Sequence, residues 1–323
     1  MRHSVLDLYL SEEKIHPKLS TQKREKWYTD LWYDLKNESF NWQPRSCPVC
    51  NNNFNETAFR RFGFKYERCI KCSTLFLSPL PNEKKLNKLI KEIKEYSKKI
   101  SQEKSGKYKL NNVYKQRENW LLLNIKRINS ICKSNKKKYN IAILDDEQND
   151  ILKNLDNLYV IQRMTVGEFN KDHVLKNNFD AIVLFDVLEY STDIQKLFTN
   201  VSNSLKKSGK CFITTRCGSG MDIQICGGKS DTIFPLQHIN LVSVEGLKYI
   251  ANIFNFGIIE LSTPGLLDLQ ILKKSFTKNK GENFPLFLKY IFIYRNEYLY
   301  NNFQKFLQEN LLSSHLRAIL EKK

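Results

Sequence analysis

The sequence predicts an α/β protein, in which a mostly parallel sheet is covered by helices on both faces and is preceded by a small cysteine-rich unit. Two observations lead to this fold class. From about residue 139 the chain repeats an order of apolar strand, polar turn and helix, which is typical of parallel sheets. Before that region, two Cys-x-x-Cys pairs lie close together in the chain. A hydrophobic content of 41% is enough for a sizeable core.

The strands of this sheet are expected at short apolar segments. They are residues 140–144, 158–162, 180–185, 210–215 and 257–261. Helical stretches separate them, and the spacing of their apolar residues predicts amphipathic helices. The final segment, HLRAILEKK, is expected to form a late strand at the edge of the sheet.

Four regions follow from these patterns. They are a helical segment at 1–43, the cysteine-rich unit at 44–81, linking helices at 82–135, and the α/β domain at 136–323 with a helical insertion at about 263–312. No apolar run reaches the ~18 residues of a membrane span. The N-terminus turns acidic too early for a secretory signal, so a cytoplasmic protein with reduced thiols is expected.

The net charge of +18 allows a nucleic acid or an anionic surface as partner. The lysines are scattered along the chain, however, and compositional drift with solvated helix faces is the favoured explanation of the charge. The dense segment at 82–99 places Leu86, Leu89, Ile90 and Ile93 at helical spacing, which favours an amphipathic helix with a solvated lysine face.

The cysteine pairs are the most specific motif in the chain. CPVC (47–50) and CIKC (69–72) are separated by 18 residues, a spacing that fits a tetrahedral site of four thiolates. The predicted ligands are Cys47, Cys50, Cys69 and Cys72. Zinc is the default ion, and iron in a rubredoxin-like site has the same ligands. Because cysteine fills all four positions, the predicted role is structural and not catalytic.

Several segments together resemble class I S-adenosylmethionine-dependent methyltransferases that carry an N-terminal zinc-binding module, a type common in bacterial sugar and surface-polysaccharide pathways. They include SCPVCNNNFN, YERCIKCSTLFLSPLP, NNFDAIVLFDVLEYSTD and FPLQHINLVSVEGLKYIANIFNFG, and the resemblance covers residues 45–323. It implies a seven-stranded Rossmann-like sheet after a zinc ribbon. It also implies that S-adenosylmethionine binds at the carboxyl ends of the first strands.

The chain departs from the family at the cofactor loop. In the family the first strand ends in an acid and a glycine-rich turn, whereas here Asp145 or Asp146 stands for the acid and EQND (147–150) occupies the turn. The second strand offers Gln162 and Arg163 in place of an acid for the ribose hydroxyls, and arginine cannot accept their hydrogens. The segment FDVLEYSTD implies that Asp186 and Leu188 border the cofactor.

Three residues are candidates on the substrate side. Glu189 and Tyr190 are candidates for acid, base or orienting groups. The alternative is a helix start at which Tyr190 packs and Asp193 or Thr192 caps. His238, in a segment that borders the substrate pocket in the family, is a candidate general base, and a purely structural histidine is the alternative.

Three functions are compatible with these observations. The first is methyl transfer to a sugar or related small metabolite in a bacterial surface-glycan pathway. The second is a catalytically silent member of the fold that binds another glycan-pathway enzyme, which the missing glycines favour. The third is a zinc-ribbon nucleic-acid binder, which is disfavoured because the ribbon has few aromatic residues and no stacking motif.

Overall fold

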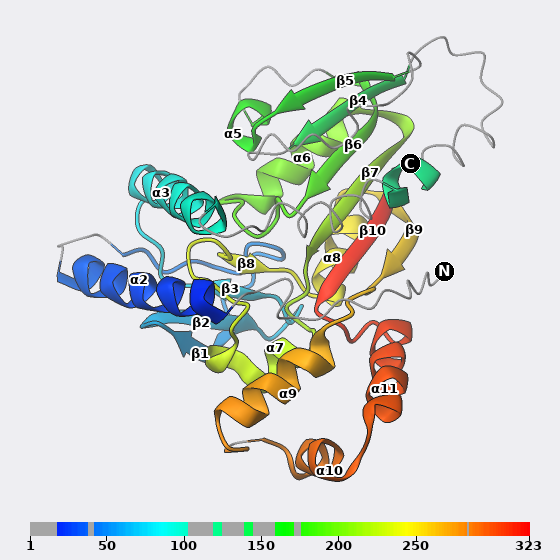
Figure 1. Cartoon of the computed structure of the whole chain (residues 1–323). Helices are drawn as coiled ribbons and strands as arrows, with labels where there is room; N and C mark the ends of the chain where they lie inside the picture. Colours follow the sequence, from blue (N-terminus) through cyan, green and yellow to red (C-terminus); the bar gives the residue numbers. More distant parts are fainter. Residues whose placement is uncertain are drawn as a thin grey trace.

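The structure is a computed structural model that describes residues 18–37, 42–102, 119–124, 139–144, 159–170, 176–282 and 284–323. These residues form a large mixed sheet, a small antiparallel sheet and a group of C-terminal helices (Figure 1). None of the described helices combines the length and the apolar character that crossing a bilayer requires.

The large sheet contains six strands in the described part of the chain, where seven were expected. In spatial order they are β5 (Tyr159–Met164), β4 (Tyr139–Leu144), β6 (Phe179–Phe185), β7 (Leu205–Arg216), β10 (His315–Lys322) and β9 (Phe256–Ser262). The first four are parallel, and β10 runs antiparallel to both of its neighbours. The predicted α/β class is therefore confirmed at the level of a mixed sheet with helices.

The expectation for the last strand was wrong in one respect. β10 lies inside the sheet between β7 and β9, and not at its edge (Figure 1). Its residues 316–320 are all buried, which is the pattern of an interior strand covered on both faces. β9 takes the edge position instead and exposes Ile259.

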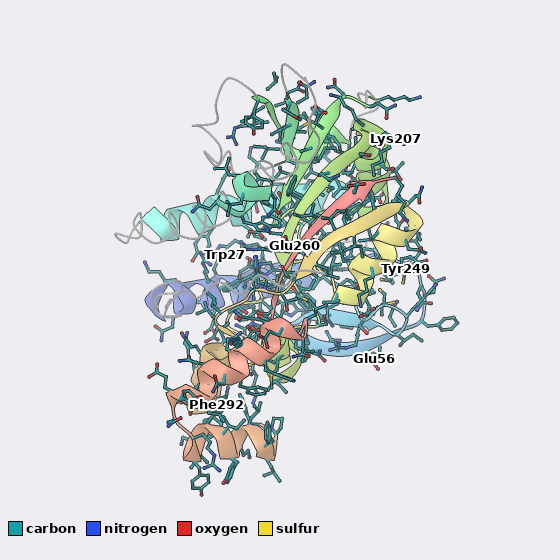
Figure 2. All side chains as sticks on the ribbon, turned by 90° about the vertical axis from the view of Figure 1, so that its right-hand side faces the viewer. Trp27, Glu56, Lys207, Tyr249, Glu260 and Phe292 are labelled. Atoms are coloured by element: carbon teal, nitrogen blue, oxygen red, sulfur yellow. The ribbon has the colours of Figure 1, made fainter. Side chains whose placement is uncertain are left out.

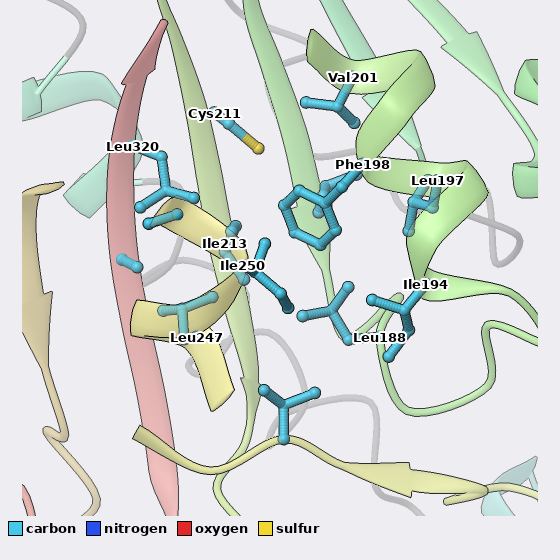
Figure 3. Packing of buried hydrophobic residues seen from close by; sticks show 14 of the residues in the cluster. Leu188, Ile194, Leu197, Phe198, Val201, Cys211, Ile213, Leu247, Ile250 and Leu320 are labelled. Carbon is cyan, nitrogen blue, oxygen red and sulfur yellow. The ribbon is translucent and has the colours of Figure 1, made fainter. Parts of the chain in front are cut away.

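Helices cover both faces of the large sheet. On one face α6 (Ile194–Ser204) and α8 (Val244–Ile253) pack against the strands, and Phe198, Ile213 and Leu247 belong to this core (Figure 3). On the other face Trp120, in the helical residues 119–124, belongs to a cluster with Phe212. Asp193 caps α6 by accepting a hydrogen bond from the Lys196 N–H at 2.8 Å, as the cap alternative predicted.

The small sheet joins the cysteine-rich unit to the α/β domain. Its strands, in order, are β1 (Asn55–Arg61), β2 (Phe64–Cys69), β3 (Leu75–Leu77) and β8 (Asn240–Leu241). The last of these comes from the α/β domain. Helices α2 (Lys18–Asn37) and α3 (Glu83–Gln102) share one hydrophobic cluster with this sheet. The predicted apolar face of α3 is buried in that cluster: Leu86, Leu89, Ile90 and Ile93.

The remaining helices are short or C-terminal. They are α5 (Val166–Phe169), α7 (Met221–Cys226), the 3-10 turn η1 (Gly227–Lys229), α9 (Asp268–Lys278), α10 (Leu286–Tyr294) and α11 (Glu297–Glu309). The last three form the predicted helical insertion between β9 and β10, and they extend away from the large sheet (Figure 1).

Candidate functional site

The four predicted thiols converge at one point. The Sγ atoms of Cys47, Cys50, Cys69 and Cys72 all lie within 4.8 Å of one another, and the four side chains are buried. The Sγ atoms of Cys47 and Cys72 are 3.5 Å apart, and those of Cys50 and Cys69 are 3.4 Å apart. Tetrahedral coordination at a Zn–S distance of about 2.3 Å requires sulfurs about 3.8 Å apart. The spacing of the cluster is compatible with a zinc ion, which these four residues would hold.

Two matching turns present the thiols. The Cys47 carbonyl accepts a hydrogen bond from Asn51 N at 2.9 Å, and the Cys69 carbonyl accepts one from Ser73 N at the same distance. Asn51 and Ser73 both adopt left-handed backbone angles, with φ of 55° and 58°. Each Cys-x-x-Cys pair is thus folded into the same tight turn, and this aims both of its sulfurs at a shared point.

The environment of the thiols agrees with ion binding. Burial raises the pKa of Cys50 to about 11, whereas a hydrogen bond from Cys47 lowers the pKa of Cys72 to about 5. One thiolate is stabilised by its neighbours, and the positive charge of a metal ion is what lets all four cysteines ionise together. With four buried protein ligands, the chemistry that such an ion supplies is structural.

The cysteine cluster is tied directly to the α/β domain. The Ser243 hydroxyl at the start of α8 donates to the Cys72 carbonyl, and the Gln195 side chain on α6 donates to the Val49 carbonyl. The Thr74 and Ser243 hydroxyl oxygens are 3.5 Å apart. The cysteine cluster is therefore hydrogen-bonded to the first turns of two helices that cover the large sheet.

Asn240 connects the two parts of the molecule at the carboxyl end of the large sheet. Its Nδ2 donates to the carbonyls of Leu188 at 2.8 Å and Ser191 at 2.7 Å. Its Oδ1 accepts from Arg45 Nη2 at 2.7 Å, and Arg45 Nη2 also reaches the Ile239 carbonyl at 2.7 Å. Asn240 is fully buried, so it fixes the segment after β6 against the cysteine-rich unit.

The candidate residues Glu189 and Tyr190 lie in that segment. Glu189 is buried, and its Oε1 accepts a hydrogen bond from Arg216 N, the last residue of β7, at 2.7 Å. Its carbonyl accepts from Asn240 N at 3.0 Å. Tyr190 is half-buried and packs against both large hydrophobic clusters. Glu189 is therefore fixed by hydrogen bonds, and Tyr190 lies nearer to the surface.

Three of the five predicted cofactor residues lie in the described part of the chain. Asp186 directly follows β6 in a left-handed conformation (φ 55°), and its Oδ1 accepts a hydrogen bond from the Thr214 hydroxyl at 3.3 Å. Leu188 is fully buried. Gln162 pairs with Ala142 and lies two residues before the end of β5. Asp145 and Asp146 lie outside the described residues.

His238 is held in a defined tautomer. Its Nδ1 accepts a hydrogen bond from Phe234 N at 3.0 Å, and its carbonyl accepts one from the Tyr66 hydroxyl at 2.8 Å. A neutral imidazole whose Nδ1 accepts carries its proton on Nε2. The imidazole therefore carries its proton on Nε2, and the role of His238 as general base stays a prediction.

Substitution of His238 tests this assignment. His238→Leu leaves the buried Phe234 N–H without its acceptor, so we expect the free energy of unfolding to fall by about 1–3 kcal/mol. His238→Asn supplies an oxygen close to the position of Nδ1 and is expected to recover most of that loss. Urea unfolding of both variants measures the difference. Equal stability of the two variants would argue against the assigned hydrogen bond.

A second polar cluster lies where β7, β10, α7 and α9 meet. Asp268 is fully buried; its Oδ1 accepts from Ser314 N at 2.8 Å, and its Oδ2 accepts from Ser313 Oγ at 2.5 Å and Gln304 Nε2 at 2.7 Å. Asp222 on α7 is also fully buried. Burial and the nearby charge of Asp268 raise the pKa of Asp222 to about 7, against the opposing effect of Arg216.

Comparison with known proteins gives structural neighbours only. A scan against protein-family models finds no match, and a search of curated proteins finds none either. Among solved structures, the chain is similar to a proposed sarcosine dimethylglycine methyltransferase from Galdieria sulphuraria, with a TM-score of 0.38 and 12% identity over 64% of this chain and 86% of that chain.

Two further solved structures are similar to this chain at comparably low sequence identity. The phosphoethanolamine N-methyltransferase 2 of Haemonchus contortus, in complex with S-adenosyl-L-methionine, has a TM-score of 0.37 and 17% identity over 64% of this chain and 52% of that chain. A SAM-dependent methyltransferase from Archaeoglobus fulgidus has a TM-score of 0.34 and 14% identity over 62% of this chain and 93% of that chain.

Proposed function

We propose that the protein transfers a methyl group from S-adenosylmethionine to a sugar or related small metabolite of a bacterial surface-glycan pathway. The observation that carries the proposal is the strand order of the large sheet. After β4 the chain adds β5 on one side and then crosses to add β6 on the other. Open α/β sheets bind their ligands outside the carboxyl ends of the strands at such a switch point. The resemblance of residues 45–323 to zinc-module methyltransferases supports the same reading and is the basis for the sugar substrate.

The residues that follow β5 and β6 would hold the cofactor. Asp186 brings a carboxylate to the end of β6, where it can attract the positive sulfonium and amino groups. Glu168 brings one to the end of β5: its Oε2 accepts a hydrogen bond from Thr165 N at 2.7 Å in a capping box. A carboxylate can accept ribose hydroxyl hydrogens, which Arg163 cannot. Glu168 was missed in the sequence because it follows the strand by four residues.

On the substrate side, we place the acceptor beside Tyr190 and His238. Both side chains are partly exposed, whereas Glu189 is buried and supports the segment that carries Tyr190. The cofactor supplies an electrophilic methyl group when it is bound. His238 and Tyr190 stay the candidates for the acid, base or orienting group that handles the proton of the acceptor.

Calorimetric titration of the full chain with S-adenosylmethionine, which carries the sulfonium charge, tests the proposal. We expect saturable heat from the wild-type chain and at least a tenfold weaker affinity, about 1.4 kcal/mol, for Asp186→Asn. Asparagine tolerates the left-handed backbone at this position, so the variant removes the charge alone.

The matched control is Asp193→Asn, because asparagine keeps the N-cap of α6 and lies in the same segment. It is expected to bind like the wild type. No heat at millimolar ligand would contradict the proposal. Co-purification of such a chain with an active glycan-pathway methyltransferase would then favour the silent-partner alternative, which the EQND turn motivates.

A further inference from the structure

Helix α10 has apolar side chains on two opposite faces. Leu288, Ile291 and Phe292 are buried in a cluster with residues of α9 and α11. The other face exposes five large apolar side chains, which are 49–82% accessible: Leu286, Phe287, Tyr290, Ile293 and Tyr294. Figure 2 shows α10 at the lower end of the molecule, with side chains that extend beyond it. The inner face packs in the core of the C-terminal helices, whereas the side chains of the outer face are largely exposed.

The exposed face continues onto α11. The rings of Phe287 and Phe303 are 6.2 Å apart, and those of Phe303 and Phe306 are 6.0 Å apart. Tyr290 and Tyr294 contact each other at 5.2 Å. The name α10 patch is used below for six residues: Leu286, Phe287, Tyr290, Ile293, Tyr294 and Phe306.

The area of the α10 patch is that of a protein interface. Large side chains of this kind have roughly 150–250 Å² each, so at their observed exposure the six residues present roughly 550–900 Å². The largest apolar patch on a typical monomer is about 300–600 Å². A standard interface buries about 800 Å² on each partner. The patch therefore lies at or above the upper end of what a monomer usually exposes and is close to what one side of a stable dimer requires.

The charge around the patch favours a second copy over an acidic partner. The chain as a whole has a net charge of +18. The segment 282–309 instead carries three basic residues (Lys289, Arg295, Lys305) and three acidic residues (Glu282, Glu297, Glu309). A membrane with anionic lipids or a nucleic acid selects a basic rim. A surface that meets its own copy needs a balanced one, because like charges repel across the interface.

The spacing of the patch residues suggests the arrangement. Phe287, Tyr290 and Tyr294 recur at i, i+3 and i+7, the spacing by which one helix packs along another. In an antiparallel pair of α10 helices, Arg295 at the C-terminal end of one helix would lie near the N-terminal end of the other helix. Glu282 precedes that N-terminal end, so opposite charges would meet. Antiparallel pairing also sets opposite helix ends side by side, which is electrostatically favourable.

We propose that two copies of this chain associate through the α10 patch, with the α10 helices antiparallel about a two-fold axis near Tyr290. In a two-fold interface each residue of the patch meets the same patch on the other chain. The proposal is independent of the methyltransferase function, since the patch lies on the insertion and not at the carboxyl end of the large sheet.

Analytical ultracentrifugation of the full chain tests the association. We expect twice the 38.1 kDa mass of the chain at micromolar concentration. The double variant Tyr290→Lys/Tyr294→Lys is expected to sediment as a monomer, with at least about 100-fold weaker association. Tyr33→Lys on α2 is the matched control, because Tyr33 is 60% exposed and Tyr294 is 65% exposed. It is expected to remain a dimer.

Cross-linking tests the geometry. Tyr290→Cys is expected to form a disulfide-linked dimer on mild oxidation, whereas Tyr33→Cys is not. A wild-type monomer at tens of micromolar, or a dimer that survives the double lysine substitution, overturns the proposal. Sedimentation of a monomeric wild type with phosphatidylglycerol vesicles overturns it in favour of a membrane. One outcome overturns the antiparallel arrangement alone: the double lysine variant is a monomer, yet Tyr290→Cys forms no disulfide-linked dimer.

Discussion

Replacement of Cys69 by serine is expected to remove the metal ion and to destabilise the whole chain. Metal content should fall from one ion per chain to near zero. The cysteine cluster belongs to the same core as the sheet residues Leu184 and Ile213, so its loss also loosens α6 and α8. Structural zinc sites contribute apparent free energies of about 10–16 kcal/mol. If only about 5 kcal/mol of this free energy is lost from the stability of the folded chain, the unfolding midpoint falls by roughly 10–20 °C.

Cys226→Ser is the control for this experiment. Cys226 is buried on α7, away from the cysteine cluster, and belongs to the cluster of the C-terminal helices. It is expected to keep full metal content and to lose little stability. Metal analysis by mass spectrometry and thermal unfolding are the two measurements. Full metal content in Cys69→Ser, or none in the wild type, would argue against the assigned site.

Asp222→Asn is expected to stabilise the protein above neutral pH. Burial first, and the charge of Asp268 second, raise the pKa of Asp222 from 3.8 to about 7 in the folded chain. The folded state therefore holds this proton more tightly than the unfolded state does. The associated stability is fully present below about pH 4 and is lost as the pH rises through about 7. The loss amounts to about 4 kcal/mol at most, and asparagine avoids it.

The comparison with Asp268→Asn makes the test specific. Asp268 accepts three hydrogen bonds, from Ser313, Ser314 and Gln304, so removal of its charge is expected to lower stability at every pH. Urea unfolding between pH 5 and pH 8.5 should show the wild type and Asp222→Asn diverging as the pH rises. Parallel curves for these two would mean that Asp222 is ionised in the folded state throughout this range.

The fold was predictable where local pattern decides it. The apolar segments at 140–144, 158–162, 180–185 and 257–261 are strands within two residues of their predicted ends. β7 begins five residues earlier than expected, because LKKSG has no apolar alternation that marks a strand. The place of β10 was not predictable, since its apolar run fits an edge or an interior strand equally and only the register with β7 and β9 decides.

The candidate site also has a part that local sequence patterns predict and a part that they do not. The four thiols converge as their spacing predicts, because each Cys-x-x-Cys turn is local. The roles of Asn240 and Arg45 depend on a contact between residues 195 positions apart, which no local pattern reveals. The tautomer of His238 depends on the backbone N–H of Phe234, which points at the ring only after the turn has formed.

The interior position of β10 has a consequence for how the chain is made. β10 is the last of the six strands in chain order, yet it separates β7 from β9. During synthesis β9 leaves the ribosome first and has no partner strand in the sheet until the residues of β10 follow. Up to that moment both β7 and β9 present unpaired backbone edges, which are open to wrong pairing with other chains. The nascent protein is therefore most exposed to aggregation just before its final strand emerges.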